Sequence, residues 1–207
     1  MEIIEARTGI LSIFALALAW FFLQKYAHSP VKKLLDRAAN NDPEAQYQMG
    51  LLYYKGQSVP RNAQKAFSWF ETAAQNGHVR AQVAVAGLYH AGTGCEQSAQ
   101  KAFEWYQHAS KTGDLEARVN LAICYLRGIG TDKDEHKGFE TMKAAADDRS
   151  PIAITLLGDL YATGRGTDKN PDSALKQYLT AAKEGEPFAQ QRLKEIKEKK
   201  EKQEMAS

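Results

Sequence analysis

Cysteine is scarce in this chain of 207 residues, which has only two, so the dense disulfide framework of a small secreted scaffold is excluded. Neither sign of charge dominates, because 27 Lys and Arg stand against 25 Asp and Glu. The resulting net charge of +2 gives no field that would attract nucleic acid or an acidic substrate, and we expect no nucleic-acid partner. What remains is an ordinary globular composition, with 43% apolar residues.

The sequence also lacks the residue clusters that are typical of catalysis. It has five histidines, and none has a second histidine or a cysteine at metal-ligand spacing. There is no phosphate-binding loop and no constellation of acid, base and nucleophile. We therefore expect no catalytic residues, no bound metal, no cofactor and no enzymatic activity.

One apolar stretch stands out near the N-terminus. Residues 8–24 contain no charged side chain, and as a helix they span about 25 Å at ~1.5 Å per residue, the short end of what crosses a bilayer. A cleaved signal peptide is the alternative, because Ala17 and Ala19 fit a small-x-small cleavage site. However, the tail at residues 1–7 carries two acidic residues and one basic residue, and a signal peptide requires a positive start. We interpret residues 8–24 as a retained transmembrane anchor.

The flanking charges predict the orientation of this anchor. One basic residue, Arg7, precedes it, and four basic residues follow within about 15 positions: Lys25, Lys32, Lys33 and Arg37. The positive-inside rule then places the rest of the chain in the cytosol, as part of a single-pass protein of the cell (inner) membrane. The alternative is an exported chain that faces the periplasm or a lumen.

A strict repeat follows the apolar stretch. Tyrosines recur every 36 residues, at Tyr53, Tyr89, Tyr125 and Tyr161. The same shift aligns five alanines: Ala45, Ala81, Ala117, Ala153 and Ala189. No insertion or deletion interrupts the period between residues 41 and 193. A repeat of this length predicts a solenoid instead of two unrelated domains.

Each unit of the repeat has the pattern of two helices and a glycine loop. In residues 42–54 the apolar positions follow the i, i+4, i+7, i+8 spacing of one helix face. A loop begins at Gly56, and a second apolar stripe ends at Gly77, a residue suited to a left-handed helix end. The sequence therefore predicts an all-α fold, an α/α superhelical solenoid of 36-residue helix-loop-helix repeats preceded by one transmembrane helix.

The period sets the boundaries of the units. They are a half repeat at 30–41, four repeats at 42–77, 78–113, 114–149 and 150–185, and a capping helix at 186–205. The capping helix ends in a run of Lys and Glu, which we interpret as a solvated end of the array. Partner binding through this charged end is the alternative.

The repeated residues form a recognisable motif. In the fourth repeat it is Ala153-x-x-x-Leu157-Gly158-x-x-Tyr161-x-x-Gly164-x-Gly166, and in the first repeat it continues as Lys65-Ala66-x-x-Trp69 and Ala73-Ala74-x-x-Gly77. Over residues 30–200 this combination resembles the Sel1-like repeat, a relative of the tetratricopeptide repeat. The resemblance implies a protein that acts in signalling, assembly or secretion mostly by binding, and by analogy a bacterial source.

Departures from the motif are local. Ser58 replaces the second loop glycine, and Arg149 stands where Gly77, Gly113 and Gly185 stand in the other repeats. An arginine in a left-handed conformation costs on the order of 1 kcal/mol. We therefore expect the loop around Arg149 to turn differently.

The two cysteines occupy unrelated positions of the repeat. Cys124 takes the place of Leu52, Leu88 and Leu160, which is typical of a packed thiol. Cys95 follows the loop glycines of the second repeat. We expect an unbridged pair. A disulfide between them is the alternative, and it would favour export.

One face of the first helix in each repeat varies between copies and is therefore free to serve recognition. It follows the spacing i, i+4, i+7, i+11, and we predict that this binding stripe holds a protein or peptide partner. Its members are Glu44, Gln48, Leu51 and Lys55; Arg80, Ala84, Gly87 and Ala91; Glu116, Asn120, Ile123 and Arg127; and Ile152, Leu156, Asp159 and Thr163. The alternative is an unused exposed face, with Ile152 and Leu156 belonging to the core.

Three functional classes follow from these patterns. The first, which we favour, is a membrane-tethered scaffold or adaptor that binds a partner protein or peptide through the solenoid. The second is an exported periplasmic repeat protein that acts in envelope assembly or secretion. The third, an enzyme, is disfavoured because no catalytic constellation is present.

Overall fold

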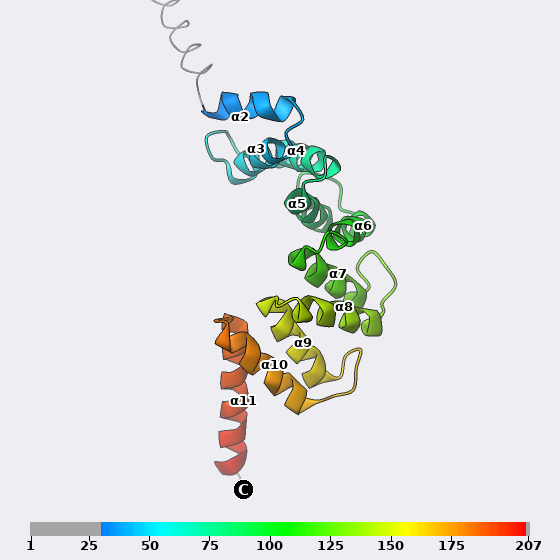
Figure 1. The fold of residues 1–207 in the computed structure, drawn as a ribbon, viewed down its shortest axis with the longest axis vertical. Coiled ribbons are helices and arrows are strands. Elements are labelled where there is room, and N and C mark those ends of the chain that lie inside the picture. The colour runs from blue at the N-terminus through cyan, green and yellow to red at the C-terminus, as the bar shows by residue number, and fades with distance from the viewer. Residues whose placement is uncertain (1–29, 206–207) are drawn as a thin grey trace, which may run out of the picture. The chain divides into compact units, whose positions relative to one another are not determined.

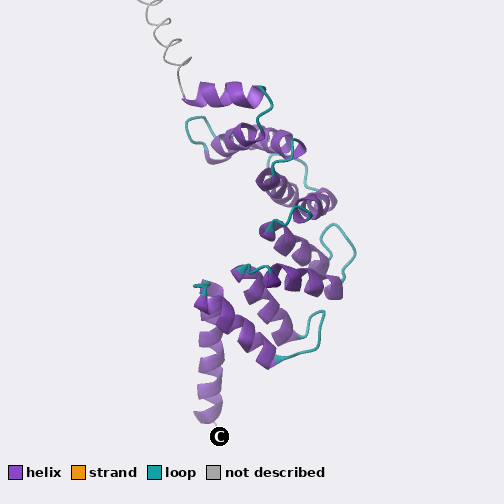
Figure 2. Cartoon of the chain, in the orientation of Figure 1, coloured by secondary structure: helices purple, strands orange, loops and turns teal. Residues whose placement is uncertain are grey.

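The computed structural model describes residues 30–205, which form ten α-helices joined by loops and contain no strand (Figures 1 and 2). The helices are α2 (Pro30–Ala39), α3 (Pro43–Lys55), α4 (Ala63–Gln75), α5 (Val79–Ala91), α6 (Ala99–Ser110), α7 (Leu115–Arg127), α8 (Glu135–Asp147), α9 (Pro151–Thr163), α10 (Pro171–Lys183) and α11 (Pro187–Met205). The predicted all-α helical repeat fold is confirmed. Helices α3, α5, α7 and α9 are the first helices of the four repeats, and α4, α6, α8 and α10 are the second helices.

The predictions for the N-terminal tail and the transmembrane anchor concern residues that precede the first described helix. Among the residues that the structure describes, no helix is both long enough and apolar enough to cross a bilayer. The predicted tail at 1–7 and the predicted anchor at 8–24 lie outside the described residues.

The chain divides into two compact units at His78 and Val79, close to the predicted boundary between the first and second repeats. In the first unit α2 packs on α3, and α3 packs on α4. In the second unit each helix from α5 to α11 packs on the next along the chain. Both units are thus built from the same helix-loop-helix repeat.

Short polar side chains begin the helices. The side chains of Asp114 and Ser150 accept hydrogen bonds from the backbone N–H groups of Ala117 and Ala153, at 2.8 and 3.3 Å. Five further helix starts have a cap of the same kind, at Asp42, Asn62, Ser98, Asp134 and Asn170. These caps satisfy backbone donors that have no partner within the helix, so each of these seven helices begins at a defined residue.

Small residues occupy the positions where helices approach most closely. The five repeated alanines of the first helices and α11 are 0% exposed, and so are four alanines of the second helices, Ala73, Ala109, Ala145 and Ala181. Gly158 lies under the ring of Tyr178, where an added Cβ would come within 2.6 Å of a ring carbon. The core of each unit therefore consists of small residues opposed to large ones.

The repeated tyrosine connects successive repeats. The ring of Tyr125 lies edge-on to Phe103 of the preceding repeat, with centroids 5.4 Å apart. Lys137 of its own repeat places its ammonium group 4.3 Å from the same ring centroid. Tyr161 makes the equivalent contact with Phe139, also at 5.4 Å. One aromatic position thus packs on one repeat and attracts a cation from the next helix.

A left-handed residue ends each second helix, and Arg149 is no exception. Its φ is 63°, compared with 87° for Gly113 and 85° for Gly185. Backbone N–H groups of Arg149 and Ser150 donate to the carbonyls of α8, just as those of Gly185 and Glu186 donate to α10. The expectation of a different turn at Arg149 is therefore wrong. A Cβ at Gly113 or Gly185 would meet nothing within 4 Å, so this turn has room for a side chain.

The second loop glycine has no such room. A Cβ at Gly130 would lie 2.0 Å from the carbonyl oxygen of Ala99, and one at Gly166 would lie 2.0 Å from that of Glu135. Each loop thus rests on the first turn of the second helix in the preceding repeat. Ser58 adopts the same conformation, with φ of 63°. The residue that would face Ser58, as Ala99 faces Gly130, is residue 27, which lies outside the described residues.

We expect alanine to be tolerated at Gly113 but not at Gly130 or Gly166. Gly113→Ala should lower the free energy of unfolding by about 1 kcal/mol, the cost of a left-handed alanine. Gly130→Ala and Gly166→Ala should each cost a further ~1–3 kcal/mol, because a backbone carbonyl must move away. Urea denaturation followed by circular dichroism measures the difference. Equal losses in all three variants would show that the loop does not depend on this contact.

Candidate functional site: the binding stripe and its C-terminal end

The predicted binding stripe lies on α3 in the first unit and on α5, α7 and α9 in the second. None of its members is buried. The exposed members are Glu44, Lys55, Arg80, Ala91, Glu116, Arg127, Ile152 and Thr163, and the partly buried members are Gln48, Leu51, Ala84, Gly87, Asn120, Ile123, Leu156 and Asp159. The stripe is therefore a surface of the fold. That it binds a partner stays a prediction.

The two apolar members of the fourth repeat differ in their surroundings. Ile152 is 53% exposed and does not belong to the core. Leu156, one turn further along α9, packs against the hydrophobic core of the second unit and is only partly buried. The alternative that both residues belong to the core is thus wrong for Ile152.

The charged members differ in what they contact. In the first unit the carboxylate of Glu44 accepts a hydrogen bond from Gln48 at 2.8 Å and lies 2.9 Å from the His78 ring nitrogen Nε2. In the second unit, within residues 79–205, the side chains of Arg80, Glu116 and Arg127 form no ion pair. The second unit therefore offers charges of both signs that no neighbour neutralises.

The stripe continues onto α11. The same shift of 36 residues leads from the four members in α9 to Phe188, Arg192, Glu195 and Lys199. Phe188 is 68% exposed. These four residues were not predicted as members of the stripe. The helix was interpreted as a solvated cap, with partner binding through its charged end as the alternative, although extending the stripe by one period finds them.

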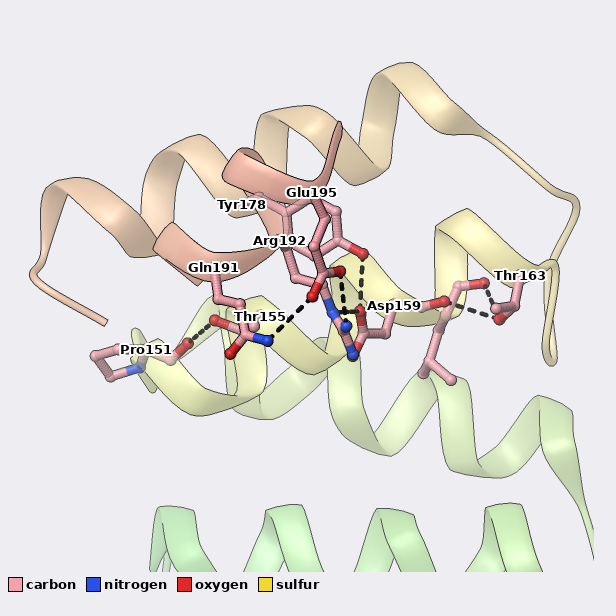
Figure 3. A network of polar contacts seen from close by, with 9 residues as sticks. Pro151, Thr155, Asp159, Thr163, Tyr178, Gln191, Arg192 and Glu195 are labelled. Carbon is pink, nitrogen blue, oxygen red and sulfur yellow. Dashed lines mark hydrogen bonds and ion pairs between the residues drawn. The ribbon is translucent and has the colours of Figure 1, made fainter. Parts of the chain in front are cut away.

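A network of polar contacts fixes α11 to α9 and α10 (Figure 3). The carboxylate of Asp159 accepts hydrogen bonds from the Tyr178 hydroxyl at 2.8 Å and from Arg192 Nε at 2.9 Å. Arg192 also donates to the second oxygen of Asp159 at 3.3 Å and to Glu195 at 3.1 Å. Asp159, predicted as a partner-binding residue, is thus already bonded to side chains of two other helices, α10 and α11.

Burial and the hydrogen bonds of the network shift the pKa values of Tyr178, Arg192 and Glu195. Burial, and then the hydrogen bond to Asp159, raise the pKa of Tyr178, so its hydroxyl stays protonated and remains a donor. Hydrogen bonds to Asp159 and Glu195 raise the pKa of Arg192, and the hydrogen bond from Arg192 lowers the pKa of Glu195. The Arg192–Glu195 pair therefore remains charged at neutral pH.

Two hollows are lined in part by residues of the network. The smaller, of about 230 Å³, opens on the stripe and is lined by Ile152, Thr155, Leu156, Asp159, Glu186, Phe188 and Arg192. The larger, of about 740 Å³, lies among α9, α10 and α11, and its walls include Asp159, Tyr178, Arg192 and Ile196. Asp159 and Arg192 line both hollows.

Other groups in the described part of the chain offer little chemistry. Residues 30–205 contain no group of three His, Cys, Asp or Glu side chains that could hold a metal ion. Both cysteines are free thiols. Burial raises the pKa of Cys124 to about 11, which leaves very little thiolate at neutral pH.

We expect Arg192→Ala to loosen α11 from the second unit. Asp159 and Glu195 would lose a charged partner, and because Arg192 is partly exposed the loss of stability should be about 1 kcal/mol. Amide hydrogen exchange in the first turns of α11 should then speed up about fivefold. Lys194→Ala is the matched control, since Lys194 is on the same helix and its ammonium group only reaches Glu198 at 3.9 Å. Equal exchange rates in both variants would contradict this role of the network.

Comparison with known proteins identifies the repeats. The family model described as Sel1 repeat matches four consecutive segments that together cover more than half of the chain: residues 43–78, 79–114, 115–149 and 151–186. No curated protein matches the chain.

Two solved structures illustrate the likeness. A protective antigen present in uropathogenic Escherichia coli strains, which displays an SLR fold, is 26% identical with a TM-score of 0.75 over 80% of this chain and 36% of that chain. A Sel1 repeat protein from Oxalobacter formigenes is 25% identical with a TM-score of 0.70 over 81% of this chain and 65% of that one. This chain therefore spans about a third of the length of the first protein and just under two thirds of the second.

These matches agree with the helices, the glycine loops and the buried alanines described above. Proteins built from Sel1 repeats generally mediate protein–protein interactions, and the fold is typically a non-catalytic scaffold. With four matching repeats across most of its described residues, the chain belongs to the Sel1 repeat family.

Proposed function

We propose that the chain is a membrane-tethered scaffold that holds a partner protein or peptide along the binding stripe of α5, α7 and α9. The observation that carries the proposal is the contrast between two sets of positions on the same helices. The alanines that pack the repeats together are constant and 0% exposed. The stripe positions change from copy to copy, and none of them is buried.

The chemistry of the stripe suits an extended peptide or a helix laid across successive repeats. Arg80, Glu116 and Arg127 provide charges without an internal partner, and the amide of Asn120 adds a donor and an acceptor. Ile123 and Ile152 add apolar surface. Charged groups at an exposed surface chiefly select partners and speed association, while apolar contacts supply most of the affinity.

The membrane tether in this proposal is supported by the sequence pattern of residues 8–24. The basic residues that follow this segment favour a solenoid on the cytosolic side of the cell membrane. A partner would then be a cytosolic protein or the cytosolic part of a membrane protein. In the exported alternative the same stripe would bind a protein of the cell envelope.

We expect simultaneous replacement of Arg80, Glu116 and Arg127 by alanine to weaken partner capture by about 10- to 100-fold, because each lost charge contact contributes on the order of 1 kcal/mol. The measurement is recovery of photo-crosslinked partner with the full-length, membrane-bound chain. Circular dichroism of each variant verifies folding.

A matched control removes one acidic and two basic side chains from second helices instead of from the stripe. Glu140, Lys143 and Lys176 are exposed residues of α8 and α10, and they comprise one acid and two bases, as the stripe triple does. Their replacement by alanine should leave recovery unchanged. Undiminished recovery with the stripe variant, or an equal loss with the control, would refute the assignment of the stripe.

We expect the chain to remain in the membrane fraction at its full mass, with a C-terminal tag protected from protease in intact cells and after permeabilisation of the outer membrane. The physical reason is an uncleaved anchor with the basic flank inside. A chain that begins at residue 30 should appear in the soluble fraction. Digestion of the tag after permeabilisation, or a shortened mature chain, would support the exported alternative and contradict the cytosolic one.

A further inference from the structure

Two large apolar side chains are exposed at the C-terminal end of the stripe. Ile152 is 53% exposed and Phe188 is 68% exposed, and both line the pocket of about 230 Å³. The corresponding position in the three preceding repeats is charged, as Glu44, Arg80 and Glu116. The position that carries a charged residue in the first three repeats therefore carries an exposed apolar residue in α9 and α11. Exposed apolar residues side by side are typical of a contact surface.

The interior of this pocket is apolar, and its volume suits a single side chain. Its inner walls are Leu156, which packs on the core, and Thr155, which is buried. The Thr155 hydroxyl donates to the carbonyl of Pro151 at 3.0 Å (Figure 3), so it is already satisfied. Sites for small-molecule ligands are usually larger, roughly 300–1,000 Å³, and contain several polar groups directed at the ligand.

The rim of the pocket is acidic. Asp159, Glu186 and Arg192 line it, and the guanidinium of Arg192 is shared between Asp159 and a third carboxylate, that of Glu195. Glu186 accepts a hydrogen bond from the backbone N–H of Phe188 at 3.3 Å, which holds its carboxylate beside the pocket. No base in the described part of the chain forms an ion pair with Glu186.

From these contacts we infer that the pocket, here named the anchor pocket, takes one large apolar side chain of the partner, and that Glu186 pairs with a Lys or Arg close to that side chain. The inference rests on the proposed function and adds the chemistry of the partner to it. An acidic segment would face an unneutralised carboxylate at the rim. A basic one would gain an ion pair beside an apolar contact that excludes water.

The test begins with a library of random 12-residue peptides selected on the full-length chain in lipid nanodiscs. We expect enrichment of peptides that carry Leu, Met, Phe or Trp within about two residues of Lys or Arg. A synthetic copy of an enriched peptide is then titrated by fluorescence anisotropy against the chain and its variants.

The combined change Ile152→Ser and Phe188→Ser should weaken peptide binding about tenfold or more, because the apolar contact is lost. Glu186→Gln keeps the acceptor for the Phe188 N–H. It should weaken binding by roughly threefold to tenfold and reduce the salt dependence. The matched control is Leu175→Ser with Leu179→Ser, two residues of α10 that are 37% and 46% exposed and do not line the anchor pocket. This control should bind as the parent chain does.

Several results would overturn the inference. They are failure to enrich any peptide, enrichment of acidic peptides, and binding that the Ile152 and Phe188 changes leave intact. A dimer in nanodiscs that dissociates on Phe188→Ser would place a second copy of the chain in the pocket instead. If the Arg80, Glu116 and Arg127 variant loses its partner while the anchor-pocket variants retain it, this inference alone fails. If neither set has an effect, the proposed function fails as well.

Discussion

The close approach of helices at alanine positions is the constraint on which the rest of this structure depends. Within each unit the repeated alanines are 0% exposed. A larger side chain there would separate two helices, because protein interiors have no spare volume. Every copy must reproduce the same approach, which accounts for a period of 36 residues without insertion or deletion. With packing fixed at a few positions, the remaining surface of each first helix is free to vary.

The fold was predictable from the sequence because its determinants are local and recur in every copy. Alanine, tyrosine and glycine at fixed spacing indicate the core, the contact between repeats and the loops. The error at Arg149 shows the limit of this reasoning. A left-handed arginine costs only on the order of 1 kcal/mol, and the open space around a Cβ at the equivalent Gly113 and Gly185 shows that this type of turn has room for a side chain. The position of an arginine in the repeat indicates the conformational free energy that a left-handed backbone costs. It does not indicate how much space surrounds the side chain.

The candidate site was predictable in position but not in its contacts. Variable residues at helical spacing indicated the stripe, yet Asp159 contacts Tyr178 and Arg192, which are 19 and 33 residues away. Such pairs depend on how successive helices are placed in space, and helical periodicity does not report this. The different burial of Ile152 and Leu156 has the same origin. Both lie on one face of α9, but Leu156 packs on the core and Ile152 in the first turn is left in solvent.

The terminal helix α11 shows why solubility alone does not account for the end of the array. Its C-terminal half carries Lys and Glu at i, i+4 spacing, with pairs at 3.9, 3.8 and 4.0 Å, as a solvated end requires. The same requirement would place a polar residue at position 188, where Phe188 is 68% exposed.

A pocket that holds one apolar side chain gives only modest affinity by itself, because such a contact contributes about 1.5–3 kcal/mol. Tethering to a membrane changes this balance, since a partner on the same membrane meets the pocket at a high effective concentration. In the proposed scaffold, therefore, the anchor pocket and the charged part of the stripe select the partner, and for a partner on the same membrane the tether strengthens their weak contacts.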